Sequence, residues 1–334
     1  MTLLEVENLG IKFGGLAALQ GASFSLKAKE IVAIIGPNGA GKTTLFNIIT
    51  GVYEPTSGFI KINDISPCEQ LDLKKTCSIL IAGLLTAVML FVTLNVESIW
   101  QAEITSNYIY QQGFQWQNLI PNFSNFLNAL SWRDSYGILL AGLILGSSAN
   151  WIIWNPSCPE VVMKHGLART FQNIRIFAKM SVLDNILVGM HCSLRSRLSN
   201  TIKSKKLEAQ AKNKAEQILK FVGLEKSKDL NADKLSYGHQ RRLEIARALA
   251  TNPKLILLDE PAAGMNPSEA EELMNLIKKI RDTGVSVLLI EHHMKVVMGI
   301  SDKIVVLNYG EKIAEGTPEE IKQNKDVIKA YLGA

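Results

Sequence analysis

The sequence predicts an α/β protein with a mixed sheet at its core. Three continuous apolar runs, 31–35, 255–258 and 285–290, suit strands that are buried on both faces of a parallel sheet. A helical pattern separates the second run from the third, as a connection between parallel strands requires. Two further runs, 303–307 and 311–314, flank a short turn and predict a final antiparallel hairpin.

A glycine-rich loop follows the first of these runs. It fits the phosphate-loop pattern Gly-x4-Gly-Lys-[Ser/Thr] without a mismatch, and the helical stretch after it ends near Gly51. In this context backbone N–H groups and a helix N-terminus can bind phosphate. Lys42 can reach the β- and γ-phosphates, and the Thr43 hydroxyl can bind Mg²⁺. We therefore expect a nucleoside triphosphate to bind at Gly36, Pro37, Asn38, Gly39, Ala40, Gly41, Lys42, Thr43 and Thr44.

Charge and cysteine usage exclude several classes of function. The 36 basic and 31 acidic residues give a net charge of +5, which is too mild and too dispersed to indicate nucleic-acid binding. The N-terminus has no basic region followed by an apolar run, so we expect no secretory signal and a site facing the cytoplasm. The cysteines show no metal-ligand spacing and are interpreted as reduced thiols: Cys68, Cys77, Cys158 and Cys192.

The parts on either side of the loop contain further elements. Residues 3–35 predict short strands that are interrupted at Phe13, whose ring could stack on adenine or pack against the core. Residues 58–62 predict another strand, and the stretch from about 173 to 235 is mainly helical. Asn266 is a candidate N-cap for the helix between the last two buried runs, which Pro267 and Glu269 begin and Gly284 follows.

Residues 69–158 differ in composition from the rest of the chain. All five tryptophans and none of the five histidines lie there. Two uncharged stretches, about 76–96 and 136–154, reach the roughly 20 residues that a helix needs to span a bilayer. They lack the polar period of a soluble surface helix, which leaves membrane helices or a pair of buried helices. We expect an inserted two-helix transmembrane hairpin, with the flanking lysines on the cytoplasmic side.

Six stretches resemble, in the right order, the motifs of ATP-binding-cassette (ABC) ATPases. Gly36–Thr43 resembles Walker A, and Leu255–Asp259 resembles Walker B. The others are Gln172 of the Q-loop, the signature Leu235–Gln240 with variants at Tyr237 and His239, the D-loop Pro261–Asn266, and the switch histidine His292. The resemblance covers 1–68 and 159–334, and it implies a P-loop ATPase core with a helical subdomain.

A finer resemblance concerns the transported substrate. Ala168–Asn173 and Glu291–Met294 are similar to ATP-binding subunits of uptake systems for branched-chain or other neutral amino acids. Urea-uptake and lipopolysaccharide-export ATPases look similar and remain alternatives. A non-transport ABC protein is a further alternative, although neither paired cassettes nor long coiled-coil arms are evident.

The resemblance also implies roles for individual residues. Glu260 would be the general base, His292 would contact the γ-phosphate, and Gln172 would join Thr43 and Asp259 at Mg²⁺. Ser236 and Gly238 would face the phosphate loop of another subunit. Because one chain carries one loop and one signature, a second ABC ATPase subunit is expected, identical or related.

The expected setting is the bacterial inner membrane, with the ATPase part on its cytoplasmic face. The resemblance implies integral-membrane permease subunits and an external substrate-binding protein as further partners. In such an assembly ATP hydrolysis would drive amino-acid uptake.

Overall fold

The computed structural model describes residues 2–63, 73–94, 108–109, 113–114, 140–145, 148, 158–195 and 201–332. Contacts within the chain divide it into two compact units. The first unit combines Met1–Cys68 with Ser157–Ala334, and the second unit is Glu69–Pro156. The first unit contains the phosphate loop and every other motif residue.

A six-stranded sheet forms the centre of the first unit. Its order is β11-β10-β3-β9-β8-β7, in which β11 is antiparallel to β10 and all other neighbours are parallel. Every residue of β3, β8 and β9 is buried, which confirms the mixed sheet expected from the apolar runs. The strands are β3 (Ile31–Ile35), β7 (Leu167–Arg169), β8 (Leu255–Asp259), β9 (Ser286–Ile290), β10 (Lys303–Asn308) and β11 (Glu311–Gly316).

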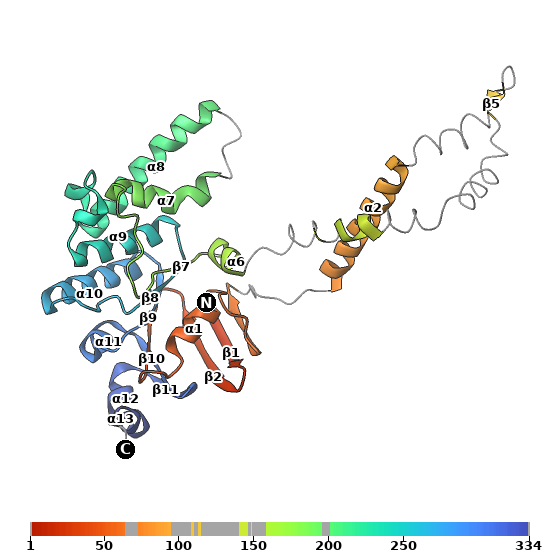
Figure 1. Ribbon diagram of the computed structural model, residues 1–334. Coiled ribbons are helices and arrows are strands. Elements are labelled where there is room, and N and C mark those ends of the chain that lie inside the picture. Colours follow the sequence, from red (N-terminus) through yellow and green to blue (C-terminus); the bar gives the residue numbers. More distant parts are fainter. Residues whose placement is uncertain are drawn as a thin grey trace. The chain divides into compact units, whose positions relative to one another are not determined.

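A second, antiparallel sheet in this unit has the order β2-β1-β4. Its strands are β1 (Thr2–Phe13), β2 (Leu16–Lys27) and β4 (Ser57–Ile62). Helix α1 (Lys42–Ile49) and residues of both sheets form one hydrophobic core. The helix contributes Leu45, Phe46, Ile48 and Ile49 to this core. This packing fixes the helix that follows the phosphate loop (Figure 1).

Helix α1 and the antiparallel sheet pack against one face of the six-stranded sheet, and most of the other helices cover its opposite face. Helices α7 (Val182–Arg195), α8 (Thr201–Val222) and α9 (Tyr237–Ala250) gather beside β7 and β8, and they confirm the expected helical subdomain (Figure 1). Two 3₁₀ turns, η3 (Glu225–Ser227) and η4 (Ala232–Lys234), connect α8 to α9. The remaining helices of this unit are α6 (Cys158–Lys164), α10 (Pro267–Asp282), α11 (Met294–Ile300), α12 (Pro318–Gln323) and α13 (Lys325–Leu332).

Helix α10 begins and ends as its sequence predicts. The Asn266 side chain accepts a hydrogen bond from the Glu269 N–H (2.9 Å), and the Glu269 carboxylate accepts one from the Asn266 N–H (3.2 Å). Pro267 occupies the first turn, and Gly284 follows the C-cap with a φ of 102°. The helix therefore carries a complete capping box.

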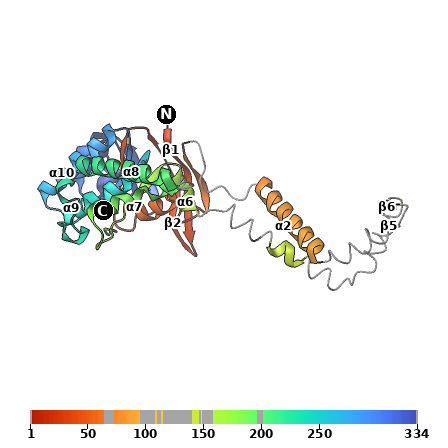
Figure 2. The same cartoon turned by 90° about the horizontal axis from the view of Figure 1, so that it is seen from above.

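The second unit contains helix α2 (Leu73–Leu94), a two-stranded hairpin of β5 (Tyr108–Ile109) and β6 (Gly113–Phe114), and a helical stretch at 140–145 (Figure 2). The Thr86 hydroxyl donates to the Gly142 carbonyl at 3.1 Å. A Cβ atom added at Gly142 would lie 2.4 Å from the Cα atom of Ala87, so the two helical stretches touch through small residues.

The structure does not support the predicted transmembrane hairpin. Within the described ranges, no helix combines the length and the apolar character that a membrane crossing requires. The first predicted segment, 76–96, overlaps α2. The second, 136–154, lies largely outside the described residues, and only 140–145 and 148 of it are described, as helix.

Candidate functional site

The phosphate loop joins the end of β3 to the start of α1, and its glycines are sterically required. A Cβ atom at Gly36 would lie 2.1 Å from the Leu307 carbonyl oxygen. Gly41 has a φ of 94°, and a Cβ atom there would lie 2.7 Å from the Ala18 carbonyl oxygen. Neighbouring strands thus approach the loop so closely that side chains are excluded, and its backbone can surround a ligand.

Lys42 is buried inside the loop. Its ammonium group donates to the carbonyl oxygens of Gly36 (2.7 Å) and Pro37 (2.8 Å). Burial lowers the pKa of Lys42, while the negative charges of Glu260 and Asp259 oppose that change. The lysine therefore lies within the electrostatic reach of both carboxylates.

Two adjacent carboxylates stand at the carboxyl end of β8. Asp259 is the last residue of the strand and is buried, whereas Glu260 begins the following turn with a φ of 46°. A left-handed backbone is uncommon for a residue with a Cβ atom. The Glu260 N–H donates to the Ile290 carbonyl at the end of β9, which anchors the turn (2.9 Å).

The structure brings Gln172 and His292 to the Glu260 carboxylate. The Gln172 side-chain amide donates to Glu260 Oε2 at 3.0 Å, and His292 Nδ1 lies 3.6 Å from Glu260 Oε1. Glu291, next to the histidine, is buried and accepts a hydrogen bond from the Ala262 N–H instead (2.9 Å). Three residues predicted to be catalytic from distant parts of the sequence therefore meet at one point.

Asp259 has a buried cationic partner that the motif assignment did not include. Arg169, the last residue of β7, places Nη2 3.2 Å from Asp259 Oδ2, and the two side chains are only 10% and 5% exposed. Its Nη1 donates to Asn47 Oδ1 (2.7 Å) and Thr50 Oγ1 (3.2 Å) on α1. Burial raises the pKa of Asp259, and Arg169 opposes that change.

A second buried ion pair, between Arg241 and Glu244 of α9, lies behind the loop that carries Gln172. Arg241 Nη1 lies 2.8 Å from Glu244 Oε2, and the two side chains are 0% and 1% exposed. Sequence reasoning missed this pair and the role of Arg169. The only available signal for the pair was its i, i+3 spacing, which an exposed surface pair would share.

The other predicted residues lie around this centre. The half-exposed ring of Phe13, at the end of β1, makes an edge contact with Tyr53 at a centroid distance of 5.3 Å. Ser236 is the N-cap of α9, and Gly238 lies against Glu269 of α10. Among the described residues, no hydrogen bond or ion pair joins Ser236 or Gly238 to the phosphate loop of the same chain.

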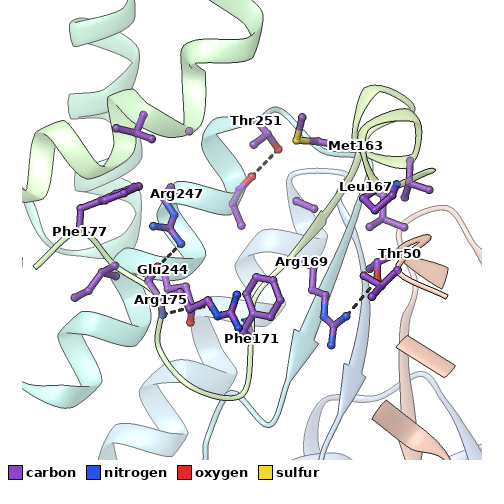
Figure 3. A pocket seen from close by; sticks show the side chains of 18 residues that line it. Thr50, Met163, Leu167, Arg169, Phe171, Arg175, Phe177, Glu244, Arg247 and Thr251 are labelled. Atoms are coloured by element: carbon purple, nitrogen blue, oxygen red, sulfur yellow. Dashed lines mark hydrogen bonds between the residues drawn. The ribbon is translucent and has the colours of Figure 1, made fainter. Parts of the chain in front are cut away.

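A mainly apolar groove of about 750 Å³ opens beside the Q-loop segment. It lies between the end of α1 and α6 on one side and helices α7 and α9 on the other (Figure 3). Arg169 points toward Thr50 at one edge of the groove, while Phe171 and Phe177 contribute aromatic rings (Figure 3). The segment that positions Gln172 therefore also lines this groove.

The phosphate loop, the buried lysine and the paired carboxylates at a nearby strand end define a nucleoside-triphosphate hydrolase of the phosphate-loop class. A family model described as "ABC transporter" matches residues 19–122 and 157–263, and the chain belongs to this family as an ATP-binding subunit. A second model, "Branched-chain amino acid ATP-binding cassette transporter", matches residues 311–334.

Relatives and solved structures agree with this family. The chain is 36% identical over 336 residues to the high-affinity branched-chain amino acid transport ATP-binding protein BraF of Pseudomonas aeruginosa, covering 99% of this chain and 98% of the relative. It is equally similar to LivG of Escherichia coli, which carries the same description. A solved ATP-binding cassette of an ABC transporter in its ADP conformation has a TM-score of 0.64 at 25% identity, with full coverage of both chains.

Proposed function

We propose that this chain hydrolyses ATP to drive uptake of branched-chain amino acids through a membrane transporter. The observation that carries the proposal is the Glu260 carboxylate, held by Gln172 and beside His292, within the field of Lys42 in the phosphate loop. The named activity of the BraF and LivG relatives, together with the C-terminal family match, supports the substrate. That match favours branched-chain amino acids over urea or lipopolysaccharide.

Phosphoryl transfer depends on positioning and on neutralisation of charge. The loop amides and Lys42 would hold the β- and γ-phosphates. On binding, the Lys42 ammonium group would replace its hydrogen bonds to the Gly36 and Pro37 carbonyls with bonds to phosphate oxygens. The positive end of α1 adds to this attraction. The half-exposed ring of Phe13 is accessible for stacking on adenine.

The donor set fits Mg²⁺, which prefers oxygen ligands and usually combines one or two carboxylates with substrate phosphates. Thr43, Gln172 and Asp259 offer a hydroxyl, an amide oxygen and a carboxylate. No group of three or more His, Cys, Asp or Glu side chains gathers around a possible metal position in the described part of the chain. This agrees with a site that the nucleotide completes. When bound, the ion would neutralise charge on the phosphates.

Glu260 would accept a proton from the attacking water while His292 contacts the γ-phosphate. The hydrogen bond from Gln172 holds one carboxylate oxygen of Glu260 and leaves the other toward His292. When the nucleotide binds, Gln172 can change partner and thereby register the γ-phosphate. In this role Glu260 must come within hydrogen-bonding reach of the water proton that it accepts.

A complete transporter requires further subunits. Ser236 and Gly238 would complete the nucleotide site of a second ATPase subunit, either identical or related. The groove beside Gln172 would receive an apolar segment of an integral-membrane permease, which would hold the chain at the cytoplasmic face of a bacterial inner membrane. An external protein would deliver the amino acid.

Substitution of the general base tests the hydrolytic role. Glu260→Gln should retain ATP binding and lower the turnover of the assembled transporter by about 10²–10⁴-fold. Phosphate release and binding of a fluorescent ATP analogue would be measured on the same preparation. Glu311→Gln, at an exposed position in β11, is the matched control and should keep its turnover. Near-normal hydrolysis by Glu260→Gln would refute the assignment.

Uptake in cells tests the substrate. Loss of the gene should abolish high-affinity uptake of radiolabelled leucine, isoleucine and valine, and the unaltered chain should restore it. Glu260→Gln should not restore it. Undiminished uptake of these amino acids beside lost uptake of urea would contradict the substrate while leaving the ATPase assignment in place.

A further inference from the structure

Arg241 binds the backbone of two residues that are predicted to be catalytic, Gln172 and Glu260. Its side chain is fully buried, and Nη2 donates to the carbonyl oxygens of Gln172 (2.8 Å) and Glu260 (3.3 Å). Its Nη1 donates to the Phe171 carbonyl at 2.6 Å and to Glu244 at 2.8 Å. One guanidinium group on α9 therefore connects the Q-loop to the turn after β8.

Glu244 extends the same connection. Its Oε1 atom accepts hydrogen bonds from the N–H groups of Phe171 (3.4 Å) and Arg175 (3.3 Å). The carboxylate also balances the buried charge of Arg241, which would otherwise be costly. The pair thus holds the Q-loop segment through its amides and its carbonyls at once.

The turn at Glu260 needs such support. A φ of 46° is strained for glutamate, and strained backbone persists only where the surroundings determine it. The Glu260 N–H is bound to Ile290 at the end of β9, and its carbonyl is bound to Arg241. These two bonds fix the backbone from which the Glu260 carboxylate projects toward Gln172.

We propose that Arg241 and Glu244 are a positioning pair for ATP hydrolysis. They hold the Gln172 and Glu260 backbones at a fixed separation and connect both to α9. The N-terminus of α9 carries Ser236 and Gly238, which would bind the nucleotide of the other subunit. A shift of α9 on binding that nucleotide would therefore be transmitted to Gln172 and Glu260 of the same chain. This inference rests on the proposed role of Glu260.

The decisive variant removes both charges together. In Arg241→Met/Glu244→Leu no buried charge is left without a partner, so the chain should fold, but the backbones of Gln172 and Glu260 lose their bonds to α9. We expect unchanged affinity for ATP and unchanged KM, because no phosphate contact is altered. The kcat should fall about 100-fold, the effect that a displacement of about 1 Å can have on a catalytic group.

A matched control removes an exposed ion pair from the same subdomain. Lys228 and Glu216 lie 3.1 Å apart with exposures of 42% and 39%, so Lys228→Met/Glu216→Leu makes the same kind of change away from the site. Its kcat and KM should equal those of the unaltered chain. Both double variants would be compared in the assembled transporter by phosphate release, nucleotide binding and circular dichroism.

The outcomes separate this inference from the proposed function. Wild-type kcat in the Arg241→Met/Glu244→Leu variant overturns the positioning role, and the proposed function stands if Glu260→Gln is still inactive. Normal turnover by Glu260→Gln refutes the proposed function itself. If the double variant does not fold, Arg241→Lys decides, because its single ammonium cannot reach all four oxygens. A lowered kcat at unchanged KM supports the role, and an unchanged kcat refutes it.

Discussion

Arg169 shows how a residue without a predicted role can support a motif residue. Its guanidinium is flanked by the rings of Phe46 (5.7 Å) and Phe171 (5.2 Å) and is bound to Asp259. A buried acid without its cationic partner is strongly destabilising when it is ionised. The stability of the folded chain should therefore depend on this pair.

We expect Arg169→Met to lower the free energy of unfolding by about 3–5 kcal/mol at neutral pH. The loss should become smaller as the pH falls. Burial raises the pKa of Asp259 and Arg169 opposes this, so without the arginine the pKa rises further. An acid whose pKa is higher in the folded state binds protons on folding, and acidification then favours the folded form.

Urea unfolding at pH 7 and pH 5 would measure this difference. Arg281→Met is a suitable control because the ion pairs of Arg281 with Asp282 and Asp302 are partly exposed. The Arg281→Met substitution should lower the free energy of unfolding only slightly at either pH. A loss for Arg169→Met that is the same at both pH values would show that packing of the side chain, not its charge, stabilises the site.

Lys42 leads to a separate prediction about binding. Charge-assisted hydrogen bonds contribute about 1.5–3 kcal/mol each, so Lys42→Ala should weaken ATP binding by roughly 10–100-fold or more. Lys61→Ala, which removes an exposed partner of Glu5, is the control and should bind normally. Calorimetry with ATP and Mg²⁺ would measure both variants. Unchanged affinity in Lys42→Ala would contradict the assignment of the phosphate loop.

The sequence predicted motif residues better than it predicted their supports. The phosphate loop Gly36–Thr43 can be identified from sequence because all the residues that define it are contiguous. Arg241 and Glu244 share a helix face by spacing, but whether that face is buried depends on Phe171 and Gln172, about 70 positions earlier in the chain. Such contacts follow from the fold and cannot be inferred from local pattern.

At the scale of elements, apolar continuity predicted the buried strands correctly. The runs at 31–35, 255–258 and 285–290 became β3, β8 and β9 because a parallel strand covered on both faces has no polar side. β7 was missed, since its three residues are too few to form a pattern. Bulges between β1 and β2 disturb the alternation that would have revealed two long strands.

The capping box of α10 gives a prediction for a single element. Asn266→Ala removes the side-chain acceptor for the Glu269 N–H and should cost about 1 kcal/mol of stability. Asn266→Ser should retain most of the stability, because serine caps helices equally well. Urea unfolding of both variants would test this. Equal losses for the alanine and serine variants would mean that the asparagine acts through a contact other than the cap.

At the scale of the whole molecule, we propose that one chain does not complete its hydrolytic site alone. The phosphate loop and the signature residues are not joined by any hydrogen bond or ion pair in the described part of the first unit. Tyr237, between Ser236 and Gly238, is 46% exposed. The start of α9 is therefore accessible to another subunit, and the nucleotide would lie between the two.

ATP should therefore bring two ATPase subunits together when hydrolysis is blocked. We expect Glu260→Gln with ATP and Mg²⁺ to elute as a dimer and with ADP as a monomer, measured by light scattering after size-exclusion chromatography. Adding Ser236→Arg should prevent the dimer, because a long cation would occupy the surface that faces the partner's phosphates. Thr317→Arg is the matched control, because Thr317 is the N-cap of α12 as Ser236 is the N-cap of α9. The Thr317→Arg variant should still form the dimer. A dimer that forms equally with ADP, or that survives Ser236→Arg, would contradict a shared nucleotide site.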